Sequence, residues 1–356
     1  MKIGIVGAGQ LARMIALAGY PLEMQFLFLD PSADACAAPL GELLLGDYDD
    51  PALLQRLAAE ADVVTYEFEN VPPASIAYLE GHCPVYPNSR SLATARDRLH
   101  EKTLLNQLGI VTAPFAAVDS LAELQQAVSE LGLPAVLKTR TLGYDGKGQA
   151  VLRKPDDIEA AWQQLGGVPL ILEGFVNFTR EVSIIAVRGR DGECRFYPLA
   201  ENTHRNGILH LSVSCPNDPL QGQAEAYADK LLAALDYVGV MALELFQADD
   251  TLIANEMAPR VHNSGHWSIE GAETSQFENH LRAIAGLPLG STAARGHAAM
   301  LNYIGELPDT HKVLAAGAHL HRYGKAPRPG RKVAHATVCA TDAQALQRRL
   351  TRLLAD

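Results

Sequence analysis

The sequence predicts a protein of mixed α/β and α+β class with more than one domain, on three observations. An apolar strand and a glycine turn open the chain, a glycine-rich loop follows near residue 143, and a hairpin with carboxylates in both arms lies near residue 250. The length of 356 residues exceeds the roughly 100–200 residues of one ordinary domain. We expect a Rossmann-like domain over 1–95, a central domain over 96–290 with a lid subdomain at about 112–175, and a small β-rich C-terminal domain over 291–356.

The composition is typical of a globular protein, with 48% hydrophobic and 20% charged residues. No apolar run reaches the roughly 18 residues that a membrane helix needs. Gln10 and Arg13 interrupt the N-terminal apolar run, which is unlike a signal peptide, so we expect a cytoplasmic protein without a membrane partner. The five cysteines show no zinc-like spacing. A net charge of −11 argues against a nucleic-acid partner but allows small anionic substrates.

The first glycine motif follows the apolar strand Lys2–Val6 and reads Gly7-Ala8-Gly9-Gln10-Leu11-Ala12. It matches the GxGxx[GA] turn of dinucleotide-binding folds, and a second strand ends in an acid at Asp30, as an NAD site requires. A tight turn at a helix N-terminus favours an anion but does not specify which one. The NAD interpretation therefore stays open, although no dehydrogenase pattern follows.

A third apolar strand is predicted over 62–70 and carries Glu67 and Glu69 two positions apart. Residues i and i+2 of a strand face the same side, and open α/β sheets bind ligands at the carboxyl ends of their strands. These carboxylates can accept hydrogen bonds from ribose hydroxyls. They can equally form a solvated acidic strand end, and both interpretations remain open.

The glycine-rich loop Leu142-Gly143-Tyr144-Asp145-Gly146-Lys147-Gly148-Gln149 lies between β-prone runs at 134–140 and 150–152. Its glycines allow the backbone to approach a ligand closely, with N–H groups directed at anionic oxygens. Lys138 and Lys147 add positive charge. The loop is a candidate lid over a triphosphate, and an ordinary hairpin with solvated lysines is the alternative.

The second hairpin carries Glu244 in one arm and Glu256 in the other. A three-residue turn at 249–251 places these two residues directly opposite each other. Facing like charges destabilise a hairpin, unless the carboxylates share Mg²⁺, which takes oxygen ligands and leaves positions for phosphates. Asn255 can supply a further oxygen. We favour the metal over a buried repulsive pair without a partner.

Two further segments are rich in hydrogen-bond donors. Residues 258–267 read APRVHNSGHW and contain too much Gly and Pro for a helix, so His262 and His266 are not a helical zinc pair. This segment suits a small anion or a developing phosphate. The basic loop at 327–333 is a candidate for a monophosphate or a solvated turn. His319 and His321 alternate along a strand, where nothing nearby completes a metal site.

In this order the segments resemble the ATP-grasp superfamily, which implies an ATP-grasp fold with a Rossmann-like pre-ATP-grasp domain. Within it, GYDGKGQ (143–149), APRVHNSGHW (258–267), RPGRK (328–332) and the Gly9-Gln10-Leu11 turn resemble the family of N5-carboxyaminoimidazole ribonucleotide synthetases of purine biosynthesis. The resemblance covers essentially the whole chain.

This resemblance implies an ATP-dependent C–N ligase. It implies carboxylation of the exocyclic amine of 5-aminoimidazole ribonucleotide by ATP and bicarbonate through carboxyphosphate, with Mg²⁺ as cofactor and a homodimeric assembly. The nearest alternative is another ATP-grasp ligase, such as a formate-dependent purine transformylase or a biotin-carboxylase-like enzyme. An NAD-dependent oxidoreductase and a nucleotide-sensing protein without turnover are the alternatives from other classes.

The resemblance also implies site residues, position by position. It implies that ATP is held by Arg98, Lys138, Gly143, Tyr144, Asp145, Gly146, Lys147, Gly148, Gln149, Glu173, Gly174, Phe175, Val176, Glu181, His204, Asn255 and Glu256. It implies that Mg²⁺ is held by Glu244 and Glu256. It implies that the ribonucleotide meets Gly9, Gln10 and Leu11, with its ribose near Glu67 and Glu69 and its phosphate near Arg331 and Lys332. The catalytic residues implied are Asp145, which orients or deprotonates the amine, and Arg260, His262, Asn263 and Lys332.

Overall fold

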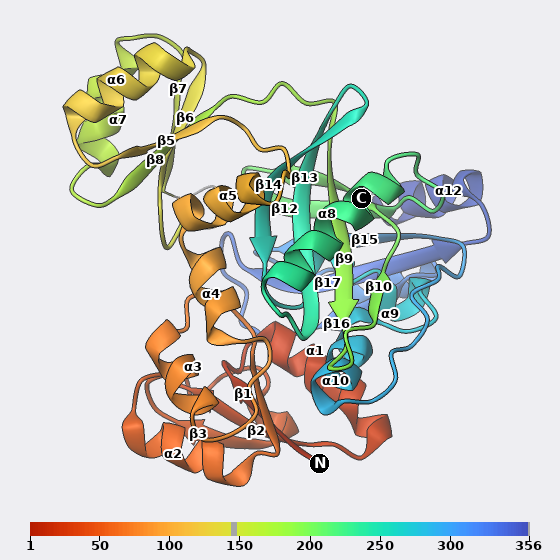
Figure 1. Ribbon diagram of the computed structural model, residues 1–356. Helices are drawn as coiled ribbons and strands as arrows, with labels where there is room; N and C mark the ends of the chain where they lie inside the picture. Colours follow the sequence, from red (N-terminus) through yellow and green to blue (C-terminus); the bar gives the residue numbers. More distant parts are fainter. Residues whose placement is uncertain (144–147, 355–356) are drawn as a thin grey trace.

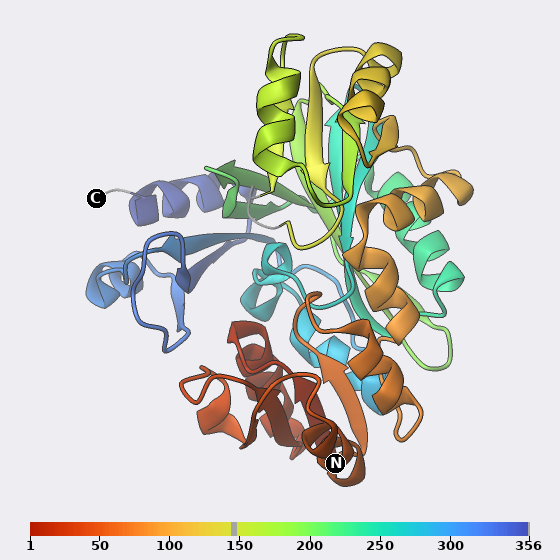
Figure 2. The ribbon, with the colours of Figure 1, turned by 90° about the vertical axis from the view of Figure 1, so that its left-hand side faces the viewer.

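The computed structural model describes residues 1–143 and 148–354. The chain forms an N-terminal unit, a projecting lid subdomain and a large body that also contains the C-terminal strands (Figure 1). A quarter turn about the vertical axis shows the N-terminal unit below the body and the lid above it (Figure 2). Within the described residues, no helix is both long and apolar enough to cross a membrane.

The N-terminal unit is a parallel sheet with the strand order β3-β2-β1-β4. Its strands are continuous apolar runs because both faces of a parallel sheet are covered. Asp50 caps the first helix after β3 by accepting from Ala52 N and Leu53 N, and Pro51 occupies the first helical position. The elements are β1 (Lys2–Val6), α1 (Gln10–Gly19), β2 (Gln25–Asp30), β3 (Glu42–Leu45), α2 (Pro51–Glu60), β4 (Val63–Tyr66) and α3 (Pro73–Glu80).

The lid subdomain is an antiparallel sheet with the order β5-β8-β6-β7. Helices α6 and α7 pack on it around a core of its own that includes Leu124, Leu137 and Leu172. The lid therefore has a hydrophobic core distinct from those of the body. The elements are β5 (Phe115–Val118), α6 (Leu121–Leu131), β6 (Ala135–Thr139), β7 (Gln149–Leu152), α7 (Asp157–Leu165) and β8 (Leu170–Gly174).

The body is built on a sheet with the order β14-β13-β9-β11-β12-β15-β17-β16, and β10 pairs with β9. The C-terminal strands β15, β17 and β16 continue the central sheet by way of β12. The strands are β9 (Arg180–Arg188), β10 (Cys194–Phe196), β11 (Ala200–Arg205), β12 (Ile208–Ser214), β13 (Gly239–Ala248), β14 (Thr251–Ala258), β15 (His297–Ile304), β16 (His319–Arg322) and β17 (Lys332–Ala340).

Alternating side chains of β9 enter two different cores. Ile185 and Val187 join the core that includes the N-terminal unit, whereas Ile184 and Ala186 join the core beneath α8 and α5, as the period of two along a strand requires. The remaining helices are α4 (Ser89–Arg96), α5 (Arg98–Gln107), α8 (Gln221–Ala234), α9 (Ser268–Gly271), α10 (Gln276–Ala285), α11 (Thr310–Ala315) and α12 (Ala343–Leu354), with the short turn η3 (Asn263–Gly265).

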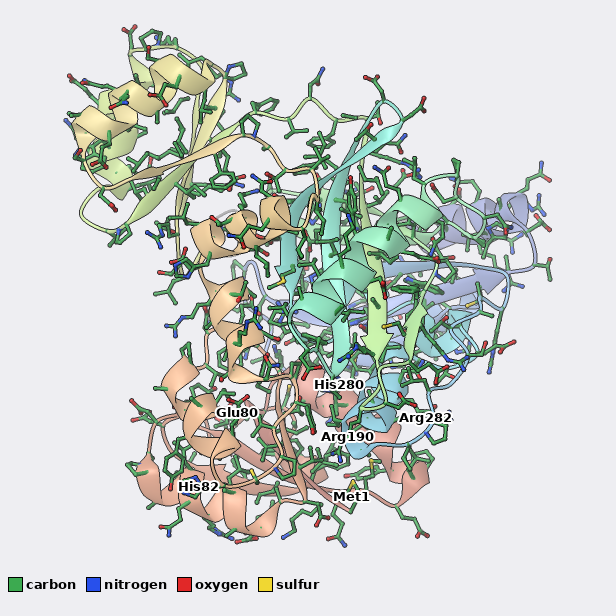
Figure 3. All side chains as sticks on the ribbon, viewed as in Figure 1. Met1, Glu80, His82, Arg190, His280 and Arg282 are labelled. Atoms are coloured by element: carbon green, nitrogen blue, oxygen red, sulfur yellow. The ribbon has the colours of Figure 1, made fainter. Side chains whose placement is uncertain are left out.

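A buried histidine joins the N-terminal unit to the body. His280 of α10 lies where the two meet (Figure 3). Its Nδ1 accepts from Val240 N of β13 at 3.1 Å, and its Nε2 lies 3.0 Å from Thr65 Oγ1 of β4. Burial lowers the pKa of His280 to about 4, so the ring is neutral and Nε2–H donates to Thr65. This bridge fixes the carboxyl edge of the N-terminal sheet against the body.

The glycine turn after β1 is filled by a carboxylate of the protein itself. Gly9 N and Ala12 N both donate to the Glu67 carboxylate, the latter at 2.9 Å. Ala8 N donates to Asp30 Oδ2, also at 2.9 Å. In dinucleotide folds this turn and helix N-terminus receive a pyrophosphate. Because Glu67 takes that place, the turn does not support the NAD interpretation.

We predict that Gly7→Ala destabilises the protein strongly. Gly7 has φ +101, and an added Cβ would lie 2.5 Å from Glu67 Cγ. Backbone strain at such a φ costs roughly 1–3 kcal/mol, and the steric overlap adds about 1–3 kcal/mol. Gly317→Ala is the matched control, because Gly317 has φ +75 and no described neighbour lies within 4 Å of its added Cβ. Thermal unfolding should show a larger loss for Gly7→Ala; equal losses would contradict the steric account.

Candidate active site

The two carboxylates of the β13–β14 hairpin face each other, as predicted. Glu244 is the direct partner of Glu256. The predicted three-residue turn is wrong, however, because Ala248 pairs with Thr251 and the turn is only Asp249-Asp250. The register then shifts between Glu244 and Leu245, so that Asn255 is the extra residue of a β-bulge. The bulge, and not the turn, brings the carboxylates opposite each other.

Each carboxylate of the pair has a cationic or donor partner. Arg98 Nη1 lies 2.5 Å from Glu256 Oε2, and His262 Nε2 lies 3.1 Å from Glu244 Oε1. Burial raises the pKa of Glu256, but the Arg98 guanidinium outweighs it and holds the pKa at about 2. The Glu256 carboxylate is therefore ionised throughout the neutral pH range, and its oxygens are available as metal ligands.

The donor set fits Mg²⁺. Two opposed carboxylates are hard oxygen ligands, and Mg²⁺ usually adds phosphate oxygens and waters to one or two protein carboxylates. Among residues 1–143 and 148–354, no cluster of three or more His, Cys, Asp or Glu side chains can hold a metal by itself. His321, one of the two alternating histidines, has its Nε2 2.6 Å from Glu270 Oε1. The Glu244–Glu256 pair therefore suits a metal ion that is already bound to a phosphate.

A buried group of charges lies where the lid subdomain meets the body. Glu173 Oε2 of β8 lies 3.0 Å from Lys138 Nζ of β6 and 3.2 Å from Lys102 Nζ of α5. Burial raises the pKa of Glu173, but the two ammonium groups lower it below its usual value. Burial lowers the pKa of Lys138, and Glu173 only partly opposes this. Lys102 was not predicted, because a lysine in an amphipathic helix ordinarily reaches solvent.

The described ends of the glycine loop lie beside Arg98 and Lys138. Gly143 O accepts from Arg98 Nη2 at 3.4 Å, and Gln149 pairs with Lys138 across β7 and β6. Gly148 has φ +70, and an added Cβ would lie 2.7 Å from Thr139 Oγ1. Glycine is therefore required there. The predicted residues that lie outside the described part of the chain are Tyr144, Asp145, Gly146 and Lys147.

The segment after β8 connects the lid to the body. Gly174 N donates to Pro114 O at 2.8 Å, and Phe175 N donates to Pro134 O at 3.2 Å. Phe175 is half exposed. This segment, which continues through Val176, thus presents an exposed aromatic ring beside the lid strands.

Glu181 and His204 form an ion pair between β9 and β11. Glu181 Oε2 lies 2.8 Å from His204 Nδ1. Burial lowers the pKa of His204, but the hydrogen bond and the charge of Glu181 outweigh it and raise the pKa above its usual value. The structure therefore brings together two residues that were predicted for the nucleotide site.

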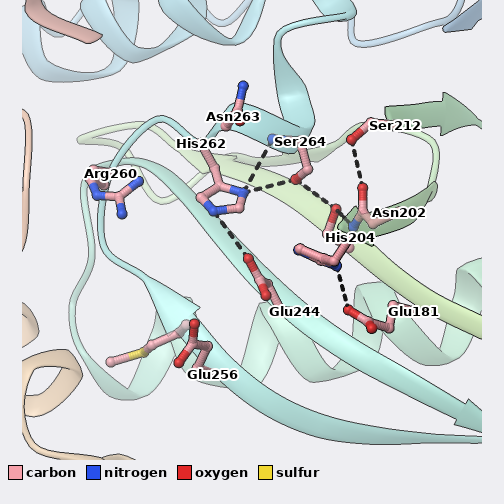
Figure 4. A network of polar contacts seen from close by, with 12 residues as sticks. Glu181, Asn202, His204, Ser212, Glu244, Glu256, Arg260, His262, Asn263 and Ser264 are labelled. Atoms are coloured by element: carbon pink, nitrogen blue, oxygen red, sulfur yellow. Dashed lines mark hydrogen bonds and ion pairs between the residues drawn. The ribbon is translucent and has the colours of Figure 1, made fainter. Parts of the chain in front are cut away.

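A one-way chain of buried hydrogen bonds ends at His262 (Figure 4). Ser212 Oγ donates to Asn202 Oδ1, Asn202 Nδ2 donates to Ser183 Oγ, and Ser183 Oγ donates to Ser264 Oγ. Ser264 Oγ lies 2.9 Å from His262 Nδ1, and Ser264 N donates to the same nitrogen at 3.4 Å. Nδ1 is thus an acceptor, and Nε2–H of His262 donates to Glu244. Ser183, Ser212 and Asn202 escaped prediction because no local motif contains them, and Ser264 lies within the 258–267 segment but was not singled out.

Arg260 and Asn263 are each fixed by another part of the chain. Arg260 Nε donates to Glu69 Oε2 at 2.5 Å. Asn263 exchanges amide hydrogen bonds of 3.1 and 2.7 Å with Asn302 of β15. The side chains of Arg260 and Asn263 therefore have defined orientations within the 258–267 segment. The sequence did not indicate Asn302 as a partner.

The acidic pair after β4 differs from the prediction. The strand ends at Tyr66, so Glu67 and Glu69 lie beyond it and the alternation rule does not apply to them. Glu67 holds the glycine turn, whereas Glu69 binds Arg260. The two carboxylates bind different partners. The predicted strand over 62–70 was too long, so its prediction that Glu67 and Glu69 share one face of a strand has no basis.

The glycine turn also meets the C-terminal loop. Lys325 Nζ donates to Gln10 Oε1, while the Leu11 side chain is buried. Arg331 Nη1 donates to Ala326 O at 3.3 Å, and Lys332 follows at the start of β17. A cavity of about 630 Å³ opens beside this contact, lined by Arg13, Leu307, Arg322, Gly324, Lys325 and Ala326. Basic side chains therefore gather at this end of the site, and Lys325 is an addition to the predicted set.

The antiparallel lid, the opposed carboxylates and the buried lysines define an ATP-grasp protein. The chain matches the ATP-grasp domain family over residues 103–277, the ribonucleotide synthetase preATP-grasp domain over 1–96, and the phosphoribosylaminoimidazole carboxylase C-terminal domain over 298–349. It is 61% identical to the N5-carboxyaminoimidazole ribonucleotide synthase of Pseudomonas aeruginosa over 354 residues, which cover 99% of this chain and 98% of that protein. The Bacillus subtilis enzyme of the same name is 39% identical over 94% of this chain and 90% of its own length.

Solved structures agree with these relatives. The Thermus thermophilus N5-carboxyaminoimidazole ribonucleotide synthetase superposes with a TM-score of 0.95 at 57% identity, covering 99% of this chain and 97% of that one. The Aspergillus clavatus enzyme, determined with ADP and 5-aminoimidazole ribonucleotide, gives a TM-score of 0.91 at 32% identity with the same coverages. The chain belongs to the N5-carboxyaminoimidazole ribonucleotide synthase family, as the motifs indicated.

We predict that Glu181→Gln lowers the pKa of His204. The substitution removes the charge that favours the protonated ring. Because the folded-state pKa is raised, the pair stabilises the folded protein at pH values below the unfolded pKa of about 6.5. This contribution is lost as the pH rises through the folded-state pKa. NMR titration of the histidine ring protons measures the shift. Glu193→Gln, at the exposed pair with Arg195, is the control, and an unchanged titration in Glu181→Gln would contradict the assignment.

Proposed function

We propose that this chain uses ATP and bicarbonate to carboxylate the exocyclic amine of 5-aminoimidazole ribonucleotide, giving N5-carboxyaminoimidazole ribonucleotide, ADP and phosphate in purine biosynthesis. The relatives carry the name of this activity. The observation that carries the proposal is the Glu244–Glu256 pair, which has Arg98 on one side and His262 on the other. Phosphate chemistry and bicarbonate chemistry can therefore meet at one pair of carboxylates.

On the nucleotide side we propose that Lys138 and Arg98 bind phosphate oxygens, with Glu173 to Val176, Glu181 and His204 around the nucleoside. Glu244 and Glu256 would hold Mg²⁺, which supplies charge neutralisation at the phosphate oxygens when bound. Once phosphates and metal are present, Arg98 and His262 exchange their carboxylate contacts for new ones. Until then the Arg98 ion pair and the His262 hydrogen bond hold the two carboxylates.

In the first step an oxygen of bicarbonate attacks the γ-phosphorus, and the bond from that phosphorus to the β,γ-bridging oxygen breaks, so that ADP leaves. Charge spreads over the γ-phosphoryl oxygens, where Lys138 and Arg98 stabilise it. Arg260 and the Nε2–H of His262 would hold the bicarbonate oxygens, with Asn263 beside them. These donors are preorganised by Glu69, the serine chain and Asn302, so little reorganisation opposes the reaction.

In the second step the amine nitrogen of the ribonucleotide forms a bond to the carboxyl carbon of carboxyphosphate, or to CO₂ released from it. The carbon–oxygen bond to phosphate breaks, phosphate leaves, and the amine loses a proton. Asp145 stays our prediction for the group that orients or deprotonates the amine. Carboxyphosphate reacts with water, so we propose that the lid subdomain covers the nucleotide and keeps water out.

For the ribonucleotide we propose the Gly9-Gln10-Leu11 turn, with Arg331, Lys332 and Lys325 near the phosphate. Gln10 already meets Lys325, which supports a site between the turn and the C-terminal loop. Glu67 would then position the turn that contacts the substrate, without contacting the substrate itself. We also propose a cytoplasmic homodimer, on the family resemblance.

The proposal is tested by phosphate release from Mg-ATP and bicarbonate, with and without 5-aminoimidazole ribonucleotide. We expect release to depend on the ribonucleotide and to yield a labile carboxylated product. A formate-dependent transformylase would require formate in place of bicarbonate. Release that is independent of the ribonucleotide, in a protein that binds ATP, would remove this acceptor from the proposal.

We predict that Glu256→Gln lowers kcat by about 100-fold or more, the scale for losing a group that stabilises charge in phosphoryl transfer. Gln keeps the shape but not the charge that binds the metal. Glu278→Gln is the matched control, because Glu278 also lies 2.5 Å from an arginine, Arg282, but on the surface of α10. Steady-state phosphate release measures both variants, and more than a few per cent of wild-type turnover in Glu256→Gln would refute its role.

A further inference from the structure

The bulge that aligns Glu256 with Glu244 lies on an edge strand. β14 is the terminal strand of the body sheet, so the outer N–H and C=O groups of residues 255–257 have no neighbouring strand. Buried backbone groups require hydrogen-bond partners, and a bulge distorts the ladder further. Something other than the sheet must therefore hold this stretch in register.

Helix α5 covers that edge (Figure 1). Arg98, Glu101, Lys102 and Leu105 are spaced i, i+3, i+4 and i+7, so they share one face of the helix. The Glu101 residue is 2% exposed and the Lys102 residue 1% exposed. Charged residues are almost never this buried unless they are paired.

The contacts of this face are made to three successive residues of β14. Lys102 Nζ donates to Asn255 O at 3.2 Å, and Met257 N donates to Glu101 Oε1. Between these two anchors, Arg98 binds the Glu256 carboxylate. The backbone on both sides of Glu256 is thus tied to adjacent residues of one helix.

Lys102 also extends this connection to the nucleotide side. Its Nζ lies 3.2 Å from Glu173 Oε2, which in turn contacts Lys138. Glu173 Oε1 is buried and has no hydrogen-bond partner among residues 1–143 and 148–354. Burying such charges is costly, and well-packed apolar residues would ordinarily stabilise the helix as much or more. We therefore expect Lys102 and Glu173 to be present because they position the groups that they bind, and not because they stabilise the fold.

We propose that Glu101 and Lys102 are positioning residues that fix the bulge at Asn255 and so hold Glu256 opposite Glu244 for Mg²⁺-nucleotide binding. The inference rests on the ATP and Mg²⁺ part of the proposed function. Lys102 acts at two places, the Asn255 carbonyl and Glu173, whereas Glu101 acts only on the strand that carries Glu256. The two residues therefore have separable effects on nucleotide binding.

The test is calorimetric binding of ADP in the presence of Mg²⁺ and in the presence of EDTA. It needs neither bicarbonate nor ribonucleotide, so a failure of the carboxylation proposal leaves it interpretable. Removing a group that orients a metal ligand typically costs 10–100-fold in affinity. We therefore expect Lys102→Met and Glu101→Leu to weaken ADP binding by about 10–100-fold with Mg²⁺, and Glu101→Leu to leave binding in EDTA unchanged.

Conservative and control variants separate positioning from general destabilisation. Glu101→Gln keeps an acceptor for Met257 N and should restore the Mg²⁺-dependent affinity that Glu101→Leu loses. Lys230→Met removes a lysine that donates to a helix-end carbonyl, Leu108 O, at 3.1 Å, and should bind MgADP like the parent protein. If Lys102→Met does not fold, Lys102→Gln, whose amide still donates, takes its place.

Three results would overturn the proposal. The first is a Glu101→Leu protein that is folded by circular dichroism and binds MgADP with parental affinity. The second is a Lys102 variant that loses ADP affinity equally with Mg²⁺ and in EDTA, since Lys102 would then act through Glu173 alone. The third is a loss of affinity that Glu101→Gln fails to restore, which would exclude the Met257 contact as the cause.

Discussion

The repulsion between Glu244 and Glu256 is the constraint on which the site depends. Two carboxylates opposed on a hairpin are unfavourable unless cations or donors offset them, and here Arg98 and His262 do so from opposite sides. Each of these partners is held in turn, Arg98 at the start of α5 and His262 by the serine chain. The two carboxylates therefore face each other with a protein partner on each.

The same constraint explains why separate units of the chain converge here. The lid supplies Lys138 and Glu173, and the N-terminal unit supplies Glu69, which binds Arg260 beside the carboxylates. The C-terminal strands supply Asn302, and they do so because they continue the central sheet. These polar contacts orient the units relative to one another, while apolar cores provide the stability.

Much of this could be predicted from sequence, because it depends on local patterns. The strand–turn–helix start, the lid hairpin and the opposed glutamates follow from glycine spacing and strand period. The bulge could not be predicted: a three-residue turn, or a two-residue turn with one extra residue at Asn255, gives the same facing pair. Glu101 and Lys102 were also out of reach, since only tertiary contact decides whether such a helix face is buried or solvated.

The glycine turn at residues 7–12 shows where a motif stops being informative. Its geometry was predicted correctly, with N–H groups converging at the start of α1. The anion it receives is Glu67, a side chain from the end of β4, and the sequence pattern is indifferent to whether a phosphate or a carboxylate fills it. Glu67 therefore holds the turn through Gly9 N and Ala12 N, while the Gln10 side chain contacts Lys325 of the C-terminal loop. In this nucleotide-type fold the protein therefore supplies the anion of the turn from its own chain.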